Sequence, residues 1–446
     1  MLKRRPSRNS RVPAGRWERL ARIGWLTGEV VLGGAAEGLR RIGGAEARSS
    51  SSFMTGANAE RLARRLSNMR GAAMKLGQML SLEADDLLPP EVAEALSVLR
   101  AEGDAMPDAQ LRRVLGRAWG KNWQERFREF DFEPIAAASI GQVHAAVTRD
   151  GREIACKVQY PGVADSIDSD VGNLATALKI SRILPGDLDF DPIIAEAKWQ
   201  LSREADYRME ARHLARYGEL LAGDSEFVVP RVHDDFSTKR VLAMDRLHGV
   251  PLEDLRGPEH DDGERDRAGA LLLRLLLREL FEFRFMQTDP NFANYQLLPD
   301  GRIGLLDLGA GNEITKKLSR GYEALFRAAL DRDEAALKAA AERIGFLSPD
   351  VPAPQAAALV GLIGLAMEPF CCDGVYDFGA SDLPARVRER GMELMLESHH
   401  LWRPPPPATL FLQRKLGGTF LLCVRLGARV DARALVEEAL ASAGSA

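Results

Sequence analysis

The segment of residues 287–294 constrains the fold of this chain most, because it carries polar side chains between an apolar helix and a hairpin. Its sequence is Gln287-Thr288-Asp289-Pro290-Asn291-Phe292-Ala293-Asn294, and the hairpin after it ends in Leu306-Asp307-Leu308-Gly309. In metal-assisted phosphoryl transfer one carboxylate orients the attacking oxygen, while an amide and a second carboxylate bind Mg²⁺ against the phosphates. The spacing therefore predicts Asp289 as a catalytic residue and Asn294 and Asp307 as metal ligands. Alone, Asp-Pro-Asn would indicate only a turn.

A lysine on a predicted strand lies upstream of this segment. Ile154-Ala155-Cys156-Lys157 belongs to the run Arg152–Gln159, which follows the β-type runs Arg128–Glu133 and Gln142–Thr148. Protein kinases have the same order, with a strand lysine on the α- and β-phosphates, then Asp-x-x-x-x-Asn, then Asp-Phe-Gly at the end of a hairpin. A lone strand lysine is usually a solvated edge charge. The apolar flanks and the order of the other residues predict that Lys157 binds phosphate and takes part in catalysis.

The loop before this lysine strand is rich in alanine, and its sequence is Ala136-Ala137-Ala138-Ser139-Ile140-Gly141-Gln142-Val143. On the kinase pattern G-x-G-x-x-G-x-V, Gly141 and Val143 match, whereas Ala136 and Ala138 replace the first two glycines. Alanine restricts positive φ and adds methyl groups, so the loop cannot fold over phosphates as a glycine-rich loop does. We expect Ala136, Ala137, Ala138, Ser139, Gly141 and Val143 to bind the nucleotide in a different way, and transfer to protein to suffer. An ordinary Ala-rich turn is the alternative.

Three acids lie close together on a long helical pattern, Pro192–Leu221. They are Glu204, Asp206 and Glu210, and Glu204 and Asp206 do not share a helix face. The chemistry needs one acid to pair with Lys157, and a solvated acidic face accounts for part of the cluster.

Composition and periodicity divide the chain into four segments. Residues 1–58 form a basic, Gly- and Ser-rich arm and linker; residues 59–125 are helical and include the predicted helix Asp108–Trp119. Residues 126–248 hold the short strands and the long helical pattern, and residues 249–446 are mostly helical. A small antiparallel sheet followed by a helical lobe predicts an α+β, two-lobed fold. Lys75-Leu76-Gly77-Gln78, in the second segment, would alone indicate only a lysine that extends its ammonium group to water.

The composition excludes several classes of protein. The 46% hydrophobic and 28% charged residues are typical of a soluble globular protein, not of collagen or a polytopic membrane protein. The four cysteines, Cys156, Cys371, Cys372 and Cys423, form no Cys-x-x-Cys pair, which favours a reducing compartment and argues against a zinc site. The apolar run Ala356–Met367 is too short to span a bilayer and predicts a buried helix.

Charge is unevenly distributed between the N-terminus and the rest of the chain. Residues 1–22 carry eight Lys or Arg and one acid, whereas the rest has 52 basic against 63 acidic residues, so we expect no nucleic-acid partner. The apolar, Gly-rich stretch Ile23–Arg41 contains Glu29 and Glu37, which favours a helix lying on a membrane over one that spans it. A mobile arm without a partner and an Arg-rich organelle presequence are the alternatives. No secretory signal is visible in the sequence.

Together these residues resemble the ADCK/UbiB family of atypical kinase-like proteins, the aarF-domain-containing group, over about residues 60–425. The resemblance rests on the Lys-x-Gly-Gln motif, the Ala-rich loop and the Glu-x-Asp pair Glu204 and Asp206. The Gln-Thr-Asp-Pro-Asn-x-Ala-Asn segment is similar to the branch associated with coenzyme Q biosynthesis. Arg414-Lys415-Leu416-Gly417-Gly418 also looks like a family segment.

The resemblance implies a protein-kinase-like fold with a helical N-terminal extension over the site where a kinase binds peptide. It implies that Lys75 projects toward the nucleotide pocket and interacts with Glu204 and Asp206, and that Glu210 pairs with Lys157. On this basis Lys75 is a candidate for both catalysis and regulation, and the other regulatory candidates are Gly77, Gln78, Glu204 and Asp206.

Family members bind ATP or ADP with Mg²⁺ and hydrolyse ATP in place of clear protein kinase activity. Implied partners are quinone precursor lipids or the enzymes that process them, with a homodimer as one expected form. From the sequence we expect a cytoplasmic location, the resemblance adds peripheral membrane contact, and an organellar inner membrane stays open.

The residues support part of this independently. No Ala-Pro-Glu follows Asp307-Leu308-Gly309, a helix is expected almost at once over Ile314–Arg332, and Gln287-Thr288 stand where kinases have His-Arg. A kinase without an extended activation segment lacks the usual platform for a protein substrate. We therefore expect a Mg²⁺-dependent ATPase; a small-molecule or protein kinase and a non-catalytic, nucleotide-gated scaffold are the alternatives.

Overall fold

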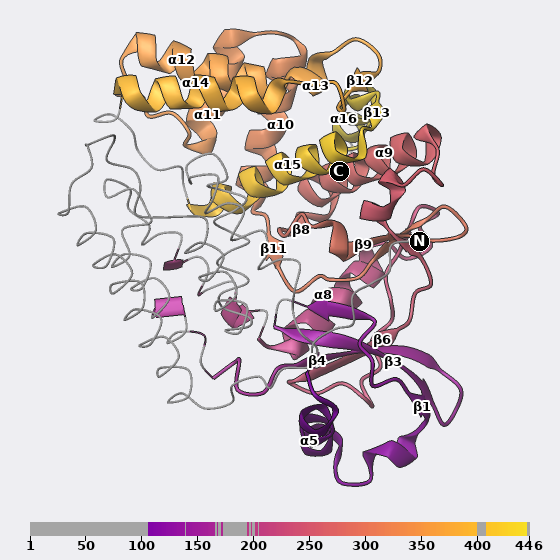
Figure 1. Ribbon diagram of the computed structural model, residues 1–446. Helices are drawn as coiled ribbons and strands as arrows, with labels where there is room; N and C mark the ends of the chain where they lie inside the picture. The colour runs from indigo at the N-terminus through magenta and orange to yellow at the C-terminus, as the bar shows by residue number, and fades with distance from the viewer. Residues whose placement is uncertain are drawn as a thin grey trace, which may run out of the picture. The chain divides into compact units, whose positions relative to one another are not determined.

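The protein is represented by a computed structural model (Figure 1). The structure describes residues 106–138, 140–165, 205–398 and 407–443, together with 167, 171–172, 194–195, 198 and 201–203. Several predicted features lie outside the described residues: the arm of residues 1–58, the helices before residue 106 with Lys75, Gly77 and Gln78, and the single positions Ser139 and Glu204.

The chain divides into two compact units. The first unit holds the chain up to Arg212 together with Arg231–Arg246, and the second holds His213–Pro230 and Leu247–Ala446. The boundary after Arg212 falls within helix α8 (Tyr207–Leu220). The four segments that composition predicts, 1–58, 59–125, 126–248 and 249–446, stay predictions.

The first unit is built on a five-stranded antiparallel sheet, of which β1 to β4 are drawn in purple in Figure 1. Its strands, in spatial order, are β1 (Phe127–Phe130), β3 (Gly141–Thr148), β4 (Glu153–Gln159) and β6 (Val241–Asp245), with β2 (Ala136–Ala138) paired to β3. Every residue of β4 except Glu153 is buried, because β4 lies between β3 and β6. The apolar run around Lys157 is therefore a central strand, and the two predicted strands that became β3 and β4 are confirmed to within one residue.

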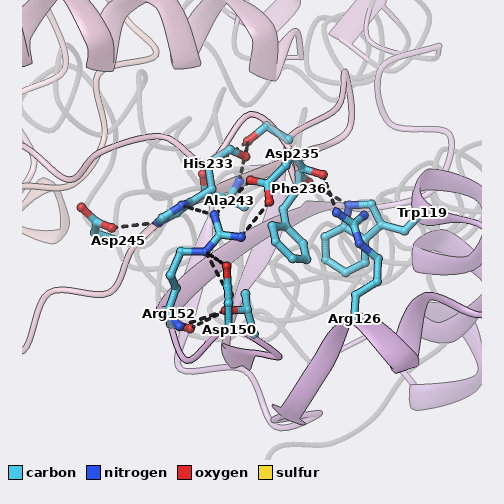
Figure 2. Close-up of polar contacts among 11 residues, drawn as sticks. Trp119, Arg126, Asp150, Arg152, His233, Asp235, Phe236, Ala243 and Asp245 are labelled. Atoms are coloured by element: carbon cyan, nitrogen blue, oxygen red, sulfur yellow. Dashed lines mark hydrogen bonds and ion pairs between the residues drawn. The ribbon is translucent and has the colours of Figure 1, made fainter.

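An ion-paired arginine holds the turn between β3 and β4 (Figure 2). Arg152 donates to Asp235 Oδ2 at 2.7 Å and forms an ion pair with Asp150 at 2.9 Å. Its Nη1 also lies 3.0 Å from His233 Nδ1, and the opposite ring nitrogen lies 2.8 Å from Asp245 on β6. Since an arginine only donates, His233 accepts at Nδ1 and donates at Nε2. This network ties the turn to the segment that leads into β6.

Helix α5 (Asp108–Trp119) has the predicted bounds and packs beside this sheet. Its last residue, Trp119, donates from Nε1 to the Phe236 carbonyl at 2.7 Å (Figure 2). The Arg126 guanidinium lies 4.0 Å from the centre of the Phe236 ring. Aromatic ring pairs, some tilted and some edge-on, also join α5 to β1; they are formed by Trp119, Trp123 and Phe127.

The second unit is mainly helical. Its longer helices are α9 (Asp262–Arg278), α10 (Lys316–Leu330), α11 (Glu334–Ile344), α12 (Ala353–Ala366), α14 (Leu383–Ser398), α15 (Pro407–Leu426) and α16 (Ala432–Ala443), with the short α13 (Glu368–Cys371). A capping box formed by Asp261 and Glu264 starts α9, and a buried leucine face packs it against α15 and α16. A π-helical turn, η3 (Glu279–Phe283), ends α9.

The second unit also contains several pairs of short strands, which the loops connect. β9 (Tyr295–Leu297) and β10 (Ile303–Leu305) form the predicted hairpin, flanked by β5 (Phe227–Val228) and β7 (Val250–Pro251). β8 (Phe285–Gln287) pairs with β11 (Gly311–Glu313), and β12 (Tyr376–Asp377) pairs with β13 (Arg429–Val430). The β8–β11 pair was not expected, because two strands of three residues leave no alternating pattern to detect.

One helix prediction was wrong in its extent, and another was correct as a helix but wrong in its burial. The long helical pattern Pro192–Leu221 is interrupted, because Ala205 and Asp206 lie outside any helix and α8 begins at Tyr207. Asp206 accepts a hydrogen bond from the Arg208 N–H at 3.1 Å, a local contact by which aspartate starts a new helix. The predicted buried helix, now α12, buries only Ala356 and Val360, because α11, α13 and α14 pack along part of its surface.

Candidate functional site

Lys157 forms a buried ion pair within the first unit. Its Nζ lies 2.7 Å from Glu210 Oε1, and the two side chains are 8% and 2% exposed. Strand β4 supplies the lysine and the first turn of α8 supplies the acid, so two regular elements fix both groups. Glu210 is therefore the acid that contacts Lys157. Removing either partner would leave a buried charge without its counter-ion, which is costly, so the two side chains stay in contact.

The Ala-rich segment is an edge hairpin in the first unit. Ala136, Ala137 and Ala138 pair with Val143, Gln142 and Gly141 as strand β2, so three of the predicted nucleotide-binding positions lie on extended backbone. Gly141 has a packing reason to be glycine, since a Cβ there would lie 2.3 Å from the Val158 carbonyl oxygen. A larger residue would push β3 away from β4 next to Lys157.

In the second unit the three remaining candidates lie on one pair of neighbouring loops. Asn294 is buried, and its Nδ2 donates to the Asp289 carbonyl at 2.8 Å. The Asn294 carbonyl accepts from the Leu306 N–H at 2.9 Å, which brings the residue before Asp307 alongside. The Asp307 carboxylate accepts from the Gly309 N–H at 3.0 Å. The structure thus brings Asp289, Asn294 and Asp307 together through backbone contacts.

Gln287 connects the two loops directly. Its Nε2 donates to the Asp307 carbonyl at 2.9 Å, and its Oε1 accepts from the Asp289 N–H. Thr288 donates from its hydroxyl to the Ala310 carbonyl at 2.8 Å. Gln287 and Thr288, which stand where kinases have His-Arg, therefore connect the end of β8 to the segment that leads into β11. Their hydrogen bonds fix the positions of both aspartates.

Helix α15 contacts the same loop from the C-terminal part of the chain. Arg414 Nη2 lies 3.2 Å from Asp289 Oδ1, and the two side chains are 13% and 17% exposed. Four residues later, a Cβ on Gly418 would lie 2.1 Å from Pro290 Cγ. Glycine is therefore needed for α15 to approach the loop this closely.

A buried polar cluster lies next to these contacts. Lys415 Nζ is 3.3 Å from Glu279 Oε2 and donates to the Tyr295 hydroxyl at 3.1 Å. Glu279 Oε1 accepts from the Tyr217 hydroxyl at 2.7 Å and from the Gln287 N–H at 3.1 Å. Burial alone would lower the pKa of Lys415, but the Glu279 carboxylate and the Tyr295 hydroxyl raise it overall. Lys415 is therefore a fixed cation beneath the loop.

The donor set of Asn294 and Asp307 fits Mg²⁺. The bond from Asn294 Nδ2 to the Asp289 carbonyl leaves Oδ1 as the amide atom suited to a metal. No cluster of three or more His, Cys, Asp or Glu able to hold a metal occurs among the described residues. Mg²⁺ usually takes one or two protein oxygens and completes its shell with phosphate oxygens and water. The two residues therefore suit a metal that arrives with a phosphate ligand.

Sequence reasoning missed the groups that support the loop. It assigned no role to Glu279, Tyr217 or Gln287, and it noted Arg414 and Lys415 only as part of a family segment. One signal was available, because Glu279 and Lys415 stand in largely apolar helical runs, where a charge is almost always paired. The identity of each partner was not readable, since Lys415 and Tyr295 are 120 positions apart.

A family model described as the ABC1 atypical kinase-like domain matches residues 98–341. The chain is also similar to curated relatives across nearly its whole length. It is 41% identical to the mitochondrial atypical kinase COQ8B of Rattus norvegicus over 97% of this chain and 82% of that protein. It is 36% identical to the mitochondrial atypical kinase COQ8 of Saccharomyces cerevisiae, over 97% of this chain and 86% of that protein.

A solved structure has a similar fold. The structure of Rv3197 from Mycobacterium tuberculosis, a complex with erythromycin, has a TM-score of 0.59 and 27% identity over 86% of this chain and 95% of that one. With the family match, this likeness confirms the predicted α+β, protein-kinase-like fold. Within the described part of the chain, no helix has the length and apolar character needed to cross a membrane.

Proposed function

The chain belongs to the ABC1 atypical kinase-like family, and on that premise we propose that it is a Mg²⁺-dependent, ATP-binding ATPase that supports coenzyme Q biosynthesis at a membrane. Its relatives carry the names atypical kinase COQ8 and COQ8B, which supports the setting. The geometry of its own residues supports the chemistry.

The observation that carries the proposal is the brace between the two aspartate loops. Gln287 contacts the Asp289 N–H and the Asp307 carbonyl, and Asn294 contacts the Asp289 carbonyl. Phosphoryl transfer depends on the position of such groups more than on covalent chemistry. A loop pair fixed at both aspartates supports that requirement.

Each residue has a proposed role. Asp289 orients the oxygen that attacks the terminal phosphoryl group, and Asn294 and Asp307 hold Mg²⁺. Bound Mg²⁺ neutralises phosphate charge in this class of reaction. Lys157, held by Glu210, binds phosphate oxygens of ATP or ADP, and the hairpin Ala136–Ala138 with Gly141 and Val143 lies along the same sheet.

Water is the proposed acceptor of the phosphoryl group. Strand β11 follows Asp307-Leu308-Gly309 after one residue, and α10 begins at Lys316. This short connection offers no extended segment on which a peptide could lie. The proposed membrane contact is peripheral, with a quinone precursor lipid or a biosynthetic enzyme as the partner.

ATP hydrolysis by the full chain tests the proposal. We expect slow, Mg²⁺-dependent hydrolysis that anionic liposomes or a phenolic quinone headgroup analogue stimulate and that Asp307→Asn abolishes. Phosphate transfer from labelled ATP to a defined acceptor at a rate above hydrolysis would favour a kinase. Hydrolysis that survives Asp307→Asn would overturn the proposed function.

A further inference from the structure

Helix α15 contacts the loop of residues 287–294 from a distant part of the sequence. Arg414 and Asp289 are 125 positions apart, yet their side chains form an ion pair of 3.2 Å. Both side chains are largely shielded from water, at 13% and 17% exposure. An arginine–carboxylate contact in such a place has defined geometry, since the planar guanidinium directs its N–H groups.

A second contact on the same helix face limits how the loop and helix can move apart. Gly418 lies one helical turn after Arg414, so both face the loop. The absent side chain at Gly418 lets Pro290, the residue after Asp289, pack directly against the helix backbone. Arg414 therefore holds the carboxylate of Asp289 while Gly418 accommodates its neighbour.

The buried cluster next to these contacts also links α15 to the loop and limits their relative movement. Lys415 contacts Glu279, whose carboxylate accepts from the N–H of Gln287 at the start of the loop. Arg414 thus contacts Asp289 directly, and the next residue, Lys415, is linked to Gln287 through Glu279. Two direct contacts and this indirect one leave the loop little freedom to rotate against α15.

We propose that Arg414 is a positioning residue for the phosphoryl-transfer reaction, and that α15, through Arg414 and Gly418, sets the orientation of the Asp289 carboxylate. This inference rests on the proposed function and assigns to the α15 segment a role in turnover. It predicts that disturbing α15 lowers the rate of turnover more than the affinity for nucleotide. A misplacement of about 1 Å can reduce a rate by roughly a hundredfold.

The first experiment compares Arg414→Gln with Arg425→Gln, a change at an exposed arginine near the end of the same helix. We expect Arg414→Gln to lower kcat by roughly ten- to a hundredfold with KM within about threefold. Arg414→Lys should recover part of kcat, because lysine keeps the charge but not the planar donor pair. Arg425→Gln should match the wild type. An Arg414→Gln enzyme with wild-type kcat would overturn the inference.

The second experiment uses the two adjacent glycines. A Cβ at Gly418 meets Pro290, whereas a Cβ at Gly417 meets nothing within 4 Å, so Gly418→Ala and Gly417→Ala are a matched pair. We expect Gly418→Ala to lower kcat about as much as Arg414→Gln, and Gly417→Ala to keep wild-type kcat. Equal rates for the two glycine variants would contradict a role for α15.

A double variant separates this inference from the proposed function. Adding Arg414→Gln to Asp289→Asn should cause no further loss of kcat, because both changes act on one carboxylate. Independent, multiplying losses would show that Arg414 acts elsewhere. If the wild-type chain shows no Mg²⁺-dependent hydrolysis, the proposed function fails; if it hydrolyses ATP and only Asp289→Asn impairs it, the inference about α15 fails alone.

Discussion

The two groups of candidate residues are held in place in different ways. In the first unit, Lys157 and Glu210 sit on a central strand and on a helix, and one 2.7 Å ion pair joins them. In the second unit, Asp289 and Asp307 sit on loops, and hydrogen bonds from Gln287 together with the Arg414 contact fix them. Regular elements hold the first group, whereas side chains from distant segments hold the second. Packing changes between the strands around Lys157 should therefore alter stability, whereas changes to the side chains that contact the Asp289 carboxylate should alter turnover.

The largest expected effect is on turnover in the second unit. Asp289→Asn removes the carboxylate that orients the acceptor, and such a group contributes about 10²- to 10⁴-fold to rate. We expect kcat for ATP hydrolysis to fall within that range while thermal stability stays close to that of the wild type. Steady-state kinetics and a melting curve on the same preparation measure both. A stability loss as large as that from a core substitution would erase the contrast between the two groups.

The largest loss of unfolding free energy is expected from a change in the buried cluster of Lys415, Glu279 and Tyr295. Lys415→Met leaves the Glu279 carboxylate, which is fully buried, without the ammonium group 3.3 Å away. Loss of one partner from such a pair costs about 3–5 kcal/mol. Urea unfolding should show this loss, and the double change Lys415→Met with Glu279→Leu should recover part of it. A single-variant loss below about 1 kcal/mol would contradict the burial argument.

Gly141 offers a smaller effect in the first unit. Gly141→Ala places a methyl group 2.3 Å from the Val158 carbonyl, so β3 and β4 must separate next to Lys157. Overpacking of this kind costs about 1–3 kcal/mol. The control is Gly116→Ala in α5, where nothing lies within 4 Å and the change should be neutral or stabilising by up to about 1 kcal/mol. Equal unfolding free energies for the two variants would count against the close packing at Gly141.

The smallest effect concerns pH. His144 is fully buried, accepts at Nε2 from Gln142 at 2.7 Å and donates from Nδ1 to the Asp131 carbonyl at 2.9 Å. Burial lowers the pKa of His144 from its ordinary 6.5. The folded state therefore keeps a neutral ring, and stability should fall as the pH drops below about 6.5, where the unfolded chain takes up the proton. Unfolding free energies at pH 7.5 and 5.5 measure this; a His144→Gln variant should show a weaker dependence, and an equal one would exclude His144 as the cause.

The sequence predicted the parts of the site that depend on local pattern. The β-type run Arg152–Gln159 indicated the strand that carries Lys157, and the turn Pro299-Asp300-Gly301 indicated the β9–β10 hairpin. The spacing of Asp289 and Asp307 indicated a shared site, and the structure places both on neighbouring loops. These features depend on residues close together in the chain.

The rest depends on contacts between distant residues. Arg414 reaches Asp289 across 125 positions, and no periodicity in α15 indicates which residue it contacts. The exposure of α12 was mispredicted for a related reason, because an apolar run specifies a helix but not how many neighbours cover it. Asp206 ended one helical segment and began another through a single local hydrogen bond, which outweighed the helical pattern around it.

The effect of Mg²⁺ on nucleotide affinity tests the central claim most directly, because Asn294 and Asp307 have no role in it unless they hold the metal. Titration calorimetry with ADP, with and without Mg²⁺, should show markedly tighter binding with the metal for the wild type and no such gain for Asp307→Asn. Equal gains in affinity for both chains would contradict the account.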